Sequence, residues 1–288
     1  MTGTIVKAVS GFYYVAASDG ITYECKARGV FKNRGITPLV GDEAQFEYDE
    51  AHESGLVTEI LERKNSFDRP PLANVDLLII VMAAANPDPS FEILDRFLVT
   101  AEQKNVKAMI CVNKCDIAAQ DTLDAFAGYK GIYQVEFVSA KTGEGIDKLK
   151  ADLSGLKAAL AGPSGVGKSS LTNLFLGRDE SETGDISRKS LRGKNTTRHT
   201  ELFKADGFML FDTPGFTSFD AALPEDTELD RLFPEMRPYI GSCRFDDCRH
   251  LKEPGCAVTE ALEQGRISQR RYRSYTQLYE AIKNSRKY

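Results

Sequence analysis

The segment GPSGVGKS, residues 162–169, restricts the possible folds of this 288-residue chain more than any other feature. It matches the pattern G-x-x-x-x-G-K-[ST] and lies between a strand-like run, LKAALA, and a helix-like run, SSLTNLFL. Its glycines let backbone N–H groups wrap around phosphates, with Lys168 reaching the β- and γ-phosphates and Ser169 ligating Mg²⁺. The segment predicts a P-loop nucleotide site. Its expected phosphate-binding residues are Gly162, Pro163, Ser164, Gly165, Val166, Gly167, Lys168, Ser169 and Ser170, and Lys168 is also expected to be catalytic.

A second apolar run, FMLF, ends in DTPG, residues 212–215. By itself this tetrapeptide is a common turn sequence. After an apolar strand and downstream of a P-loop, it is what such a fold needs to sense the third phosphate. We therefore expect Asp212 to hold Mg²⁺ through water and Gly215 to donate its N–H to the γ-phosphate.

VNKCD, residues 112–116, indicates which base is bound. A carboxylate at Asp116 can accept from both N1–H and the exocyclic amine of guanine, in a charge-assisted bidentate pair. Adenine would leave that carboxylate unpaired, which is costly in a buried site. Asn113 is expected to brace the loop and Lys114 to lie along the base.

VSAK, residues 138–141, supports this interpretation because it also ends an apolar strand. A backbone N–H of Ser139, Ala140 or Lys141 can meet the guanine O6. Two base elements and two phosphate elements, each pair in mutual order, predict GTP as the ligand.

The base elements precede the phosphate elements, which is the reverse of the order in ordinary small GTPases. Circular permutation explains this order, since it is tolerated where old chain ends lie close together. Strand-like runs alternating with helical ones predict a mainly parallel sheet covered on both faces. The new opening follows DTPGF, so the γ-phosphate sensor leads directly into the C-terminal region. A nucleotide-driven switch could then move that region as a unit.

Two other regions flank this α/β part. Residues 1–68 contain short β-type runs separated by turn signals, which predict a small β barrel; the runs favour an OB-fold only slightly over another small barrel. We expect three domains: a barrel over 1–68, a permuted GTPase domain over 69–218, and a mainly helical zinc-binding domain with a basic helical tail over 219–288. A helix is expected in PEDTELDRLFPEMRPYI, residues 224–240.

Three of the six cysteines cluster with one of the three histidines, in the spacing C-x4-C-x-H-x5-C. Three thiolates and one imidazole complete a closed tetrahedral Zn²⁺ site, which is typical of a structural ion. Buried free thiols with a chance histidine are the alternative. The expected ligands are Cys243, Cys248, His250 and Cys256.

The formal net charge of -5 argues against a uniformly basic nucleic-acid binder. Two regions nevertheless concentrate positive charge: residues 188–200, and the tyrosine-bearing tail from residue 265. For the tail, RNA binding and packing of its tyrosines on the zinc domain are equally good interpretations. The N-terminus lacks signal-peptide features and the longest apolar run, residues 77–85, is that of a buried strand, so we expect a cytoplasmic protein, and a monomer.

The four nucleotide elements in this order, between a β barrel and the C-x4-C-x-H-x5-C spacing, resemble the RsgA/YjeQ family of circularly permuted GTPases across essentially the whole chain. The resemblance implies an OB-fold, a permuted GTPase domain and a zinc-binding domain. It also implies a factor that binds the small ribosomal subunit and its rRNA late in maturation. GTP hydrolysis would then be stimulated by the subunit and coupled to release.

The catalytic water is where the chain departs from known patterns. Phe216 follows Gly215, where ordinary small GTPases place a water-orienting glutamine. The family commonly places a histidine directly before its switch-I threonines, whereas this chain has Asn195 there and His199 a few residues later. The water-positioning group is left open between Asn195, His199 and a group supplied by the ribosome. Thr196 or Thr197 is assigned to Mg²⁺ or γ-phosphate sensing, so that the expected magnesium ligands are Ser169, Thr197 and Asp212.

Two other functions compete with an assembly GTPase. A nucleotide-gated signalling or scaffold protein would use the flanking domains to bind another protein, with turnover incidental. An ATPase is disfavoured by Asp116.

Overall fold

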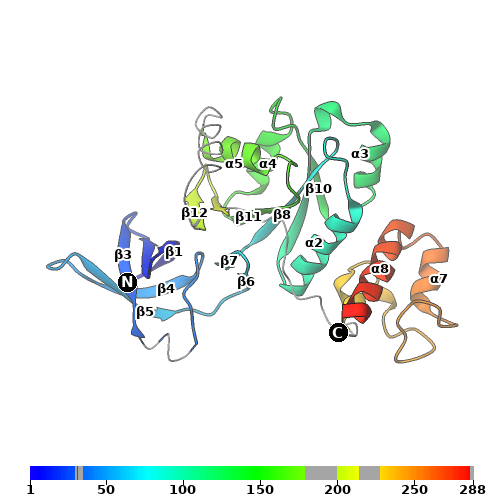
Figure 1. Ribbon diagram of the computed structural model, residues 1–288, viewed down its shortest axis with the longest axis horizontal. Helices are drawn as coiled ribbons and strands as arrows, with labels where there is room; N and C mark the ends of the chain where they lie inside the picture. Colours follow the sequence, from blue (N-terminus) through cyan, green and yellow to red (C-terminus); the bar gives the residue numbers. More distant parts are fainter. Residues whose placement is uncertain (30, 32–34, 179–199, 214–227, 286–288) are drawn as a thin grey trace.

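The computed structural model describes residues 1–29, 31, 35–178, 200–213 and 228–285. Three parts follow one another along an elongated molecule: a strand-only part at the N-terminal end, a central α/β part and a small helical part at the C-terminal end (Figure 1). Within the described ranges, no helix is long and apolar enough to cross a membrane.

The N-terminal part is a closed barrel of five strands. These are β1 (Thr2–Val9), β2 (Phe12–Ala17), β3 (Thr22–Ala27), β4 (Glu43–Asp49) and β5 (Ser54–Ile60). Their order is β1-β2-β3-β5-β4, with β4 pairing back onto β1, and only the β3–β5 pair is parallel. Alternate residues such as Ile5, Val15 and Phe46 fill the interior. The predicted barrel is present, and its closure is consistent with an OB-fold.

The central part is a six-stranded sheet, to which a short hairpin of β6 (Ser66–Asp68) and β7 (Pro71–Ala73) leads from the barrel. Its strands are β8 (Leu77–Ala83), β9 (Lys107–Asn113), β10 (Gln134–Phe137), β11 (Lys157–Ala161), β12 (Glu201–Lys204) and β13 (Met209–Asp212). The order is β10-β9-β8-β11-β13-β12, parallel except for β12. All seven residues of β8 are buried, as the apolar run predicts.

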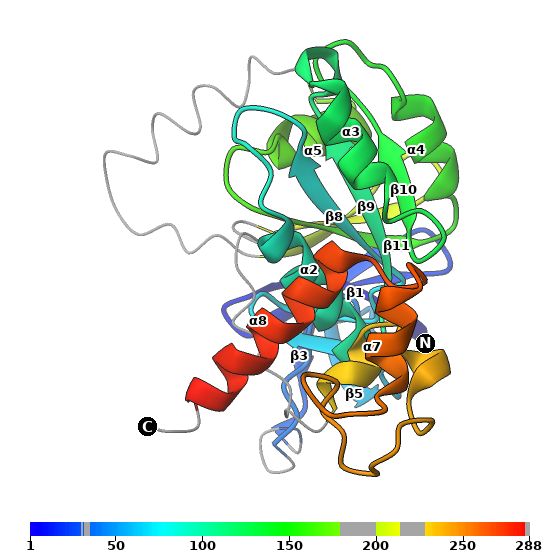
Figure 2. The same ribbon diagram turned by 90° about the vertical axis from the view of Figure 1, so that its right-hand side faces the viewer.

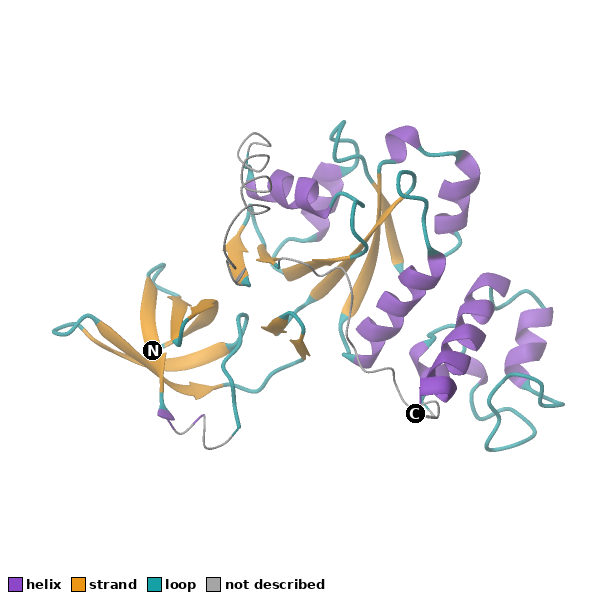
Figure 3. Ribbon diagram, viewed as in Figure 1, coloured by secondary structure: helices purple, strands orange, loops and turns teal. Residues whose placement is uncertain are grey.

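Helices cover both faces of this sheet, and each face has its own core (Figure 3). One core includes Phe97 of α2 (Phe91–Gln103) and Phe126 of α3 (Gln120–Ala127). The other includes Leu149 of α4 (Ile146–Asp152) and Phe175 of α5 (Lys168–Leu176). The parallel sheet covered on two faces, which the alternating runs predict, is therefore confirmed.

The C-terminal part contains α7 (Ala257–Glu263), α8 (Gln269–Ser285) and two single 3₁₀ turns, η2 (Leu229–Leu232) and η3 (Arg237–Tyr239). The expectation of a helix over 224–240 is wrong for the described residues 228–240, which form only those turns. Pro234 and Pro238 explain the interruption, because proline lacks the N–H that a helix interior requires.

The three described tyrosines of the basic tail pack inward. Tyr275 and Tyr279 are buried in the core of the C-terminal part, and Tyr272 is packed against it. For these three side chains the structure favours packing on the domain over stacking with RNA bases.

Candidate functional site

The phosphate loop joins β11 to α5, where the sequence places GPSGVGKS. Gly162 and Gly167 have φ angles of 142° and 99°. A Cβ on Gly162 would clash with the carbonyl of Val81, and one on Gly167 would clash with the side-chain amide of Asn113. The loop can therefore lie against β8 and β9 only with glycine at these two positions.

Lys168 lies at the mouth of this loop, in the first turn of α5. Its Nζ donates to the carbonyl oxygens of Gly162, at 2.7 Å, and Pro163, at 2.6 Å. Burial lowers the pKa of Lys168 to about 8, because a partly desolvated ammonium is disfavoured. A nearby phosphate would favour the charged form, so the site is electrostatically suited to an anion.

Asn113, the last residue of β9, connects three of the predicted elements. Its Nδ2 donates to the carbonyl of Val166 in the phosphate loop, at 2.9 Å. Its Oδ1 accepts from the N–H of Ala140, also at 2.9 Å. A side chain buried between VSAK and the phosphate loop thereby holds both in place, which is the bracing role the sequence predicts.

Lys114 also reaches the phosphate loop. Its backbone is left-handed, with a φ of 66°, and its Nζ donates to the carbonyl of Gly165 at 2.8 Å. The same Nζ contacts the carbonyl of Asn86, in the loop that follows β8. Asn86 was not identified from the sequence, because it acts through its backbone carbonyl, and any residue type has that group.

Asp116 accepts a hydrogen bond from the side chain of Ser139, a role that was not predicted from the sequence. The Ser139 hydroxyl donates to Asp116 Oδ1 at 2.7 Å, while the Ser139 N–H donates to the carbonyl of Glu144 at 3.0 Å. VSAK was expected to act only through its backbone. Its serine also orients the Asp116 carboxylate. The hydroxyl of Ser139 was the one feature of the motif from which this role could have been predicted.

Asp212 ends β13, at the same edge of the sheet as the phosphate loop, because β13 runs parallel to β11. Arg178, just after α5, places one guanidinium nitrogen 3.4 Å from Asp212 Oδ2 and stacks at 4.5 Å over the ring of Phe203. No motif singles out Arg178, and only the fold brings it to Asp212.

Several expected site residues lie outside the described residues. These are Asn195, Thr196, Thr197, His199 and Gly215.

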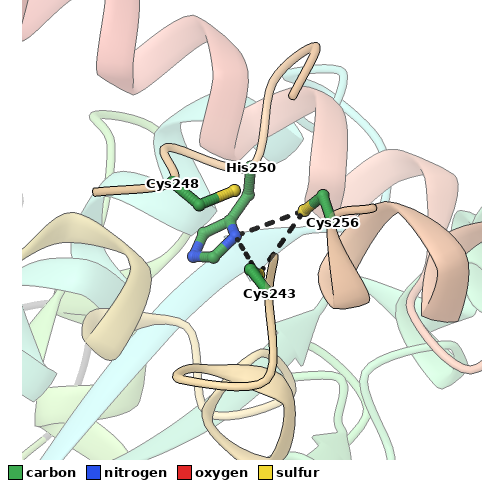
Figure 4. A group of neighbouring side chains, drawn as sticks. All are labelled: Cys243, Cys248, His250 and Cys256. Atoms are coloured by element: carbon green, nitrogen blue, oxygen red, sulfur yellow. Dashed lines mark hydrogen bonds between the residues drawn. The ribbon is translucent and has the colours of Figure 1, made fainter. Parts of the chain in front are cut away.

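The four expected zinc ligands converge in the C-terminal part (Figure 4). The donor atoms of Cys243, Cys248, His250 and Cys256 all lie within 4.8 Å of one another. His250 Nδ1 lies 3.5 Å from the Cys243 sulfur and 3.4 Å from the Cys256 sulfur. Three sulfur donors and one imidazole nitrogen at this spacing fit a tetrahedral Zn²⁺ ion, and no fifth protein group is needed.

Groups next to the four ligands support this cluster. His250 Nε2 lies 3.2 Å from Asp230 Oδ2, and a carboxylate at that nitrogen leaves Nδ1 as the metal-binding atom. Burial would raise the pKa of the Cys256 thiol, but hydrogen bonds from Thr259 and His250 lower it to about 7, toward the thiolate that binds metal. Asp230 was not identified from the sequence, since it lies 20 residues before His250 outside any motif.

The fold and the site define a class of protein. In the central sheet, VNKCD and VSAK come before the phosphate loop along the chain. A β barrel precedes this sheet and a Cys₃His cluster follows it. Together these features define a circularly permuted GTPase with two flanking domains. The chain belongs to the RsgA GTPase family. The RsgA GTPase profile matches residues 60–222, and the RsgA N-terminal domain profile matches residues 2–57.

Individual relatives agree over the whole length. The chain is 46% identical to the small ribosomal subunit biogenesis GTPase RsgA of Agathobacter rectalis, over 100% of both chains. It is 46% identical to that of Bacillus anthracis, over 98% of this chain and 97% of the relative. Among solved structures, YjeQ from Thermotoga maritima has a TM-score of 0.84 and 34% identity over 98% of each chain. YloQ, a circularly permuted GTPase, has a TM-score of 0.83 and 37% identity over 99% of this chain and 95% of that one.

The resemblance inferred from the motifs is thus confirmed, and the protein is a GTP-hydrolysing enzyme of this family. Membership implies GTP and GDP as its nucleotides, with Mg²⁺.

Proposed function

We propose that this GTPase is an assembly factor that binds the small ribosomal subunit late in maturation and is released on hydrolysis. The observation that carries the nucleotide part is the Asn113 side chain, which joins the base-binding segment to the phosphate loop. The subunit part is supported by full-length relatives described as small ribosomal subunit biogenesis GTPases.

At the phosphate end, the N–H groups of residues 162–170, except Pro163, which has none, surround the phosphates and the N-terminus of α5 adds a favourable dipole. Lys168 pairs with the β- and γ-phosphates, and Gly215 donates to the γ-phosphate. Ser169 and Asp212, with Thr197, are assigned to Mg²⁺, which when bound neutralises charge on the β- and γ-phosphates.

At the base end, Asp116 accepts from guanine while Ser139 keeps its carboxylate in the required orientation. The N–H groups of Ser139 and Ala140 are already engaged within the protein. We therefore assign the N–H of Lys141 to the guanine O6. Lys114 lies along the base.

Replacing Asp116 tests the assignment of the base. Asp116→Asn should shift the preference from guanine to xanthine nucleotides, because an amide presents a donor where the carboxylate presents an acceptor. Competition between labelled GDP and unlabelled XDP measures the shift. Ser139→Ala is the matched control: it should weaken GDP binding without changing the preferred base. An Asp116→Asn protein that still prefers guanine would refute the assignment.

Cosedimentation tests the partner. The protein should pellet with the small subunit in a non-hydrolysable GTP analogue and dissociate in GDP. Equal binding in both nucleotides, or none, would favour the alternative of a nucleotide-gated scaffold for a protein partner. Contact with rRNA is part of the proposal and is supported by Arg270 and Arg273 in α8, both of which are exposed.

The water-positioning group is to be found by substitution. Asn195→Ala and His199→Ala, each assayed for subunit-stimulated hydrolysis, separate the two candidates. Asparagine can hydrogen-bond water but cannot act as a base. Full activity in both variants would leave a group supplied by the ribosome as the remaining candidate for positioning the water.

The remaining assignments complete the proposal. The Cys₃His cluster binds one structural Zn²⁺ through Cys243, Cys248, His250 and Cys256. Domain boundaries near residues 68 and 218, a monomeric state and a cytoplasmic location are retained as proposed.

A further inference from the structure

A row of three residues on adjacent strands connects the N-terminal barrel to Asp212, at the edge of the nucleotide site. Lys7 of β1 lies opposite Glu201 of β12, and Glu201 lies opposite Asp212 of β13. The Lys7 ammonium is 3.1 Å from a Glu201 carboxylate oxygen. A single strand, β12, therefore separates the barrel from the aspartate assigned to Mg²⁺. In Figure 1, β12 lies between the barrel and the rest of the central sheet.

A second contact comes from Gly41, in the turn before β4. A Cβ at this position would lie 2.7 Å from Cζ of Phe211, the residue before Asp212, and would also clash with the carbonyl of Ala73. Phe211 is 2% exposed, so its ring has little room to move away. The barrel backbone is thus in close contact with the strand that ends in Asp212.

The Gly41 turn is itself held firmly. The Gly41 N–H donates to the carbonyl of Ile5 at 2.8 Å, and the side chain of Asn74 donates to the Gly41 carbonyl at 3.0 Å. The next residue, Asp42, is fully buried and accepts from the backbone N–H of Leu39 and from Arg63, both at 2.7 Å. A turn with this many partners transmits displacement to its neighbours, because packed interiors yield little.

We propose that the N-terminal barrel positions the Asp212 carboxylate and thereby sets how strongly the nucleotide site holds Mg²⁺. Gly41 and Lys7 are positioning residues, since they act through Phe211 and Glu201. Asp212 is the last residue of β13, so the neighbouring strands fix the position of its backbone, while its carboxylate lies 3.4 Å from Arg178. The inference rests on the proposed role of Asp212, and it concerns the regulation of that site.

The test measures the affinity of the full-length protein for a fluorescent GTP analogue with and without Mg²⁺. Gly41→Ala should reduce the Mg²⁺-dependent gain in affinity about tenfold, which corresponds to about 1.4 kcal/mol, because the added methyl would clash with the Ala73 carbonyl and with the Phe211 ring. Binding of GDP without Mg²⁺ should stay unchanged. Gly20→Ala is the matched control: Gly20 also has a positive φ, 85°, but nothing lies within 4 Å of a Cβ there.

A charge-swap series tests the second contact without adding bulk. Lys7→Glu places like charges in the row that leads to Asp212 and should reduce the Mg²⁺-dependent gain about two- to threefold. Glu201→Lys should also reduce the gain, because it places an ammonium opposite Asp212 that competes with Mg²⁺. The double variant restores the ion pair but keeps this ammonium, so it should recover only the part of the loss that comes from the contact between residues 7 and 201. This series decides the question if Gly41→Ala does not fold.

Asp212→Asn separates the two proposals. If this variant keeps the full Mg²⁺-dependent gain, the role of Asp212 in the proposed function is wrong. If it loses the gain while the Gly41 and Lys7 variants keep it, the role of Asp212 stands and the positioning by the barrel is overturned.

Discussion

The two domains that flank the GTPase sheet are attached to it by different kinds of contact. The barrel meets the sheet through strand pairing between β1 and β12 and through partly exposed ion pairs, of which Lys7–Glu201 is one. The C-terminal part meets it through one completely enclosed group of charges, together with the partly exposed Arg237–Glu102 pair. Figure 2 shows where this happens, with α8 lying beside α2.

Arg271 of α8 is the centre of the enclosed contact. Its guanidinium, 2% exposed, lies 2.6 Å from Asp95 Oδ1 of α2 and 2.6 Å from Glu235 Oε1. The Tyr129 hydroxyl donates to the same Asp95 oxygen at 2.9 Å. Burial raises the pKa of Asp95 and Arg271 opposes that rise, so the two groups depend on each other.

The difference lies in what separation would cost. Parting an exposed pair costs about 0–1 kcal/mol, whereas leaving a buried charge unpaired costs about 3–5 kcal/mol. The order of the motifs suggested that a nucleotide-driven switch could move the C-terminal region as a unit. Any such movement would have to carry α2 along or separate Arg271 from Asp95. Separating the barrel from the sheet would break the Lys7–Glu201 ion pair, but because this pair is partly exposed its loss would cost far less.

The largest effect is expected from loss of zinc. Cys256→Ala should unfold the C-terminal domain, because a structural Zn²⁺ site contributes about 10–16 kcal/mol to folding. The barrel and the GTPase domain have cores of their own and should still bind GDP. Zinc analysis and limited proteolysis measure both results. Cys25→Ala, a change at a buried cysteine of the barrel, should leave the zinc content intact.

The next effect concerns the buried arginine. Arg271→Ala should lower the free energy of unfolding by about 3–5 kcal/mol, since it leaves the carboxylates of Asp95 and Glu235 buried without a cation. Denaturant unfolding of the zinc-loaded protein measures it. Arg273→Ala, on the exposed side of the same helix, is the control. If the two substitutions lowered the free energy of unfolding equally, the C-terminal part would not be held by a buried charge, and the contrast with the barrel interface would be wrong.

The smallest effect is expected on the barrel side. Lys7→Ala should change the free energy of unfolding by less than about 1 kcal/mol, because the Lys7–Glu201 pair is partly exposed to solvent. Unfolding at low and high salt measures it, and the small loss should shrink as salt rises. A loss as large as that of Arg271→Ala would mean that both domains are held equally firmly.

Much of the fold follows from the sequence. The glycines and lysine of GPSGVGKS, the terminal residues of apolar strands in VNKCD and VSAK, and the cysteine spacing are local patterns, and each demands one kind of backbone or ligand. For that reason they predict the sheet, the permuted order and the metal cluster. The helix expected over 224–240 is absent from the described residues 228–240, because Pro234 and Pro238 interrupt it.

Other features had no local pattern. Arg271 and Asp95 are 176 residues apart, and Arg178 and Asp212 are 34 apart. An arginine in an amphipathic helix looks the same in sequence whether it faces solvent or another domain.

By itself, then, the sequence determined the GTPase class, the permuted order of its motifs and the Cys₃His cluster, because each motif consists of residues close together in the chain. Only the tertiary structure decided that the tail tyrosines pack inward, that Ser139 orients Asp116 and Asp230 supports His250. It also decided that one flanking domain is held by a buried guanidinium and the other by a shared strand. Such contacts depend on which surfaces meet, and that is settled by packing across the whole chain.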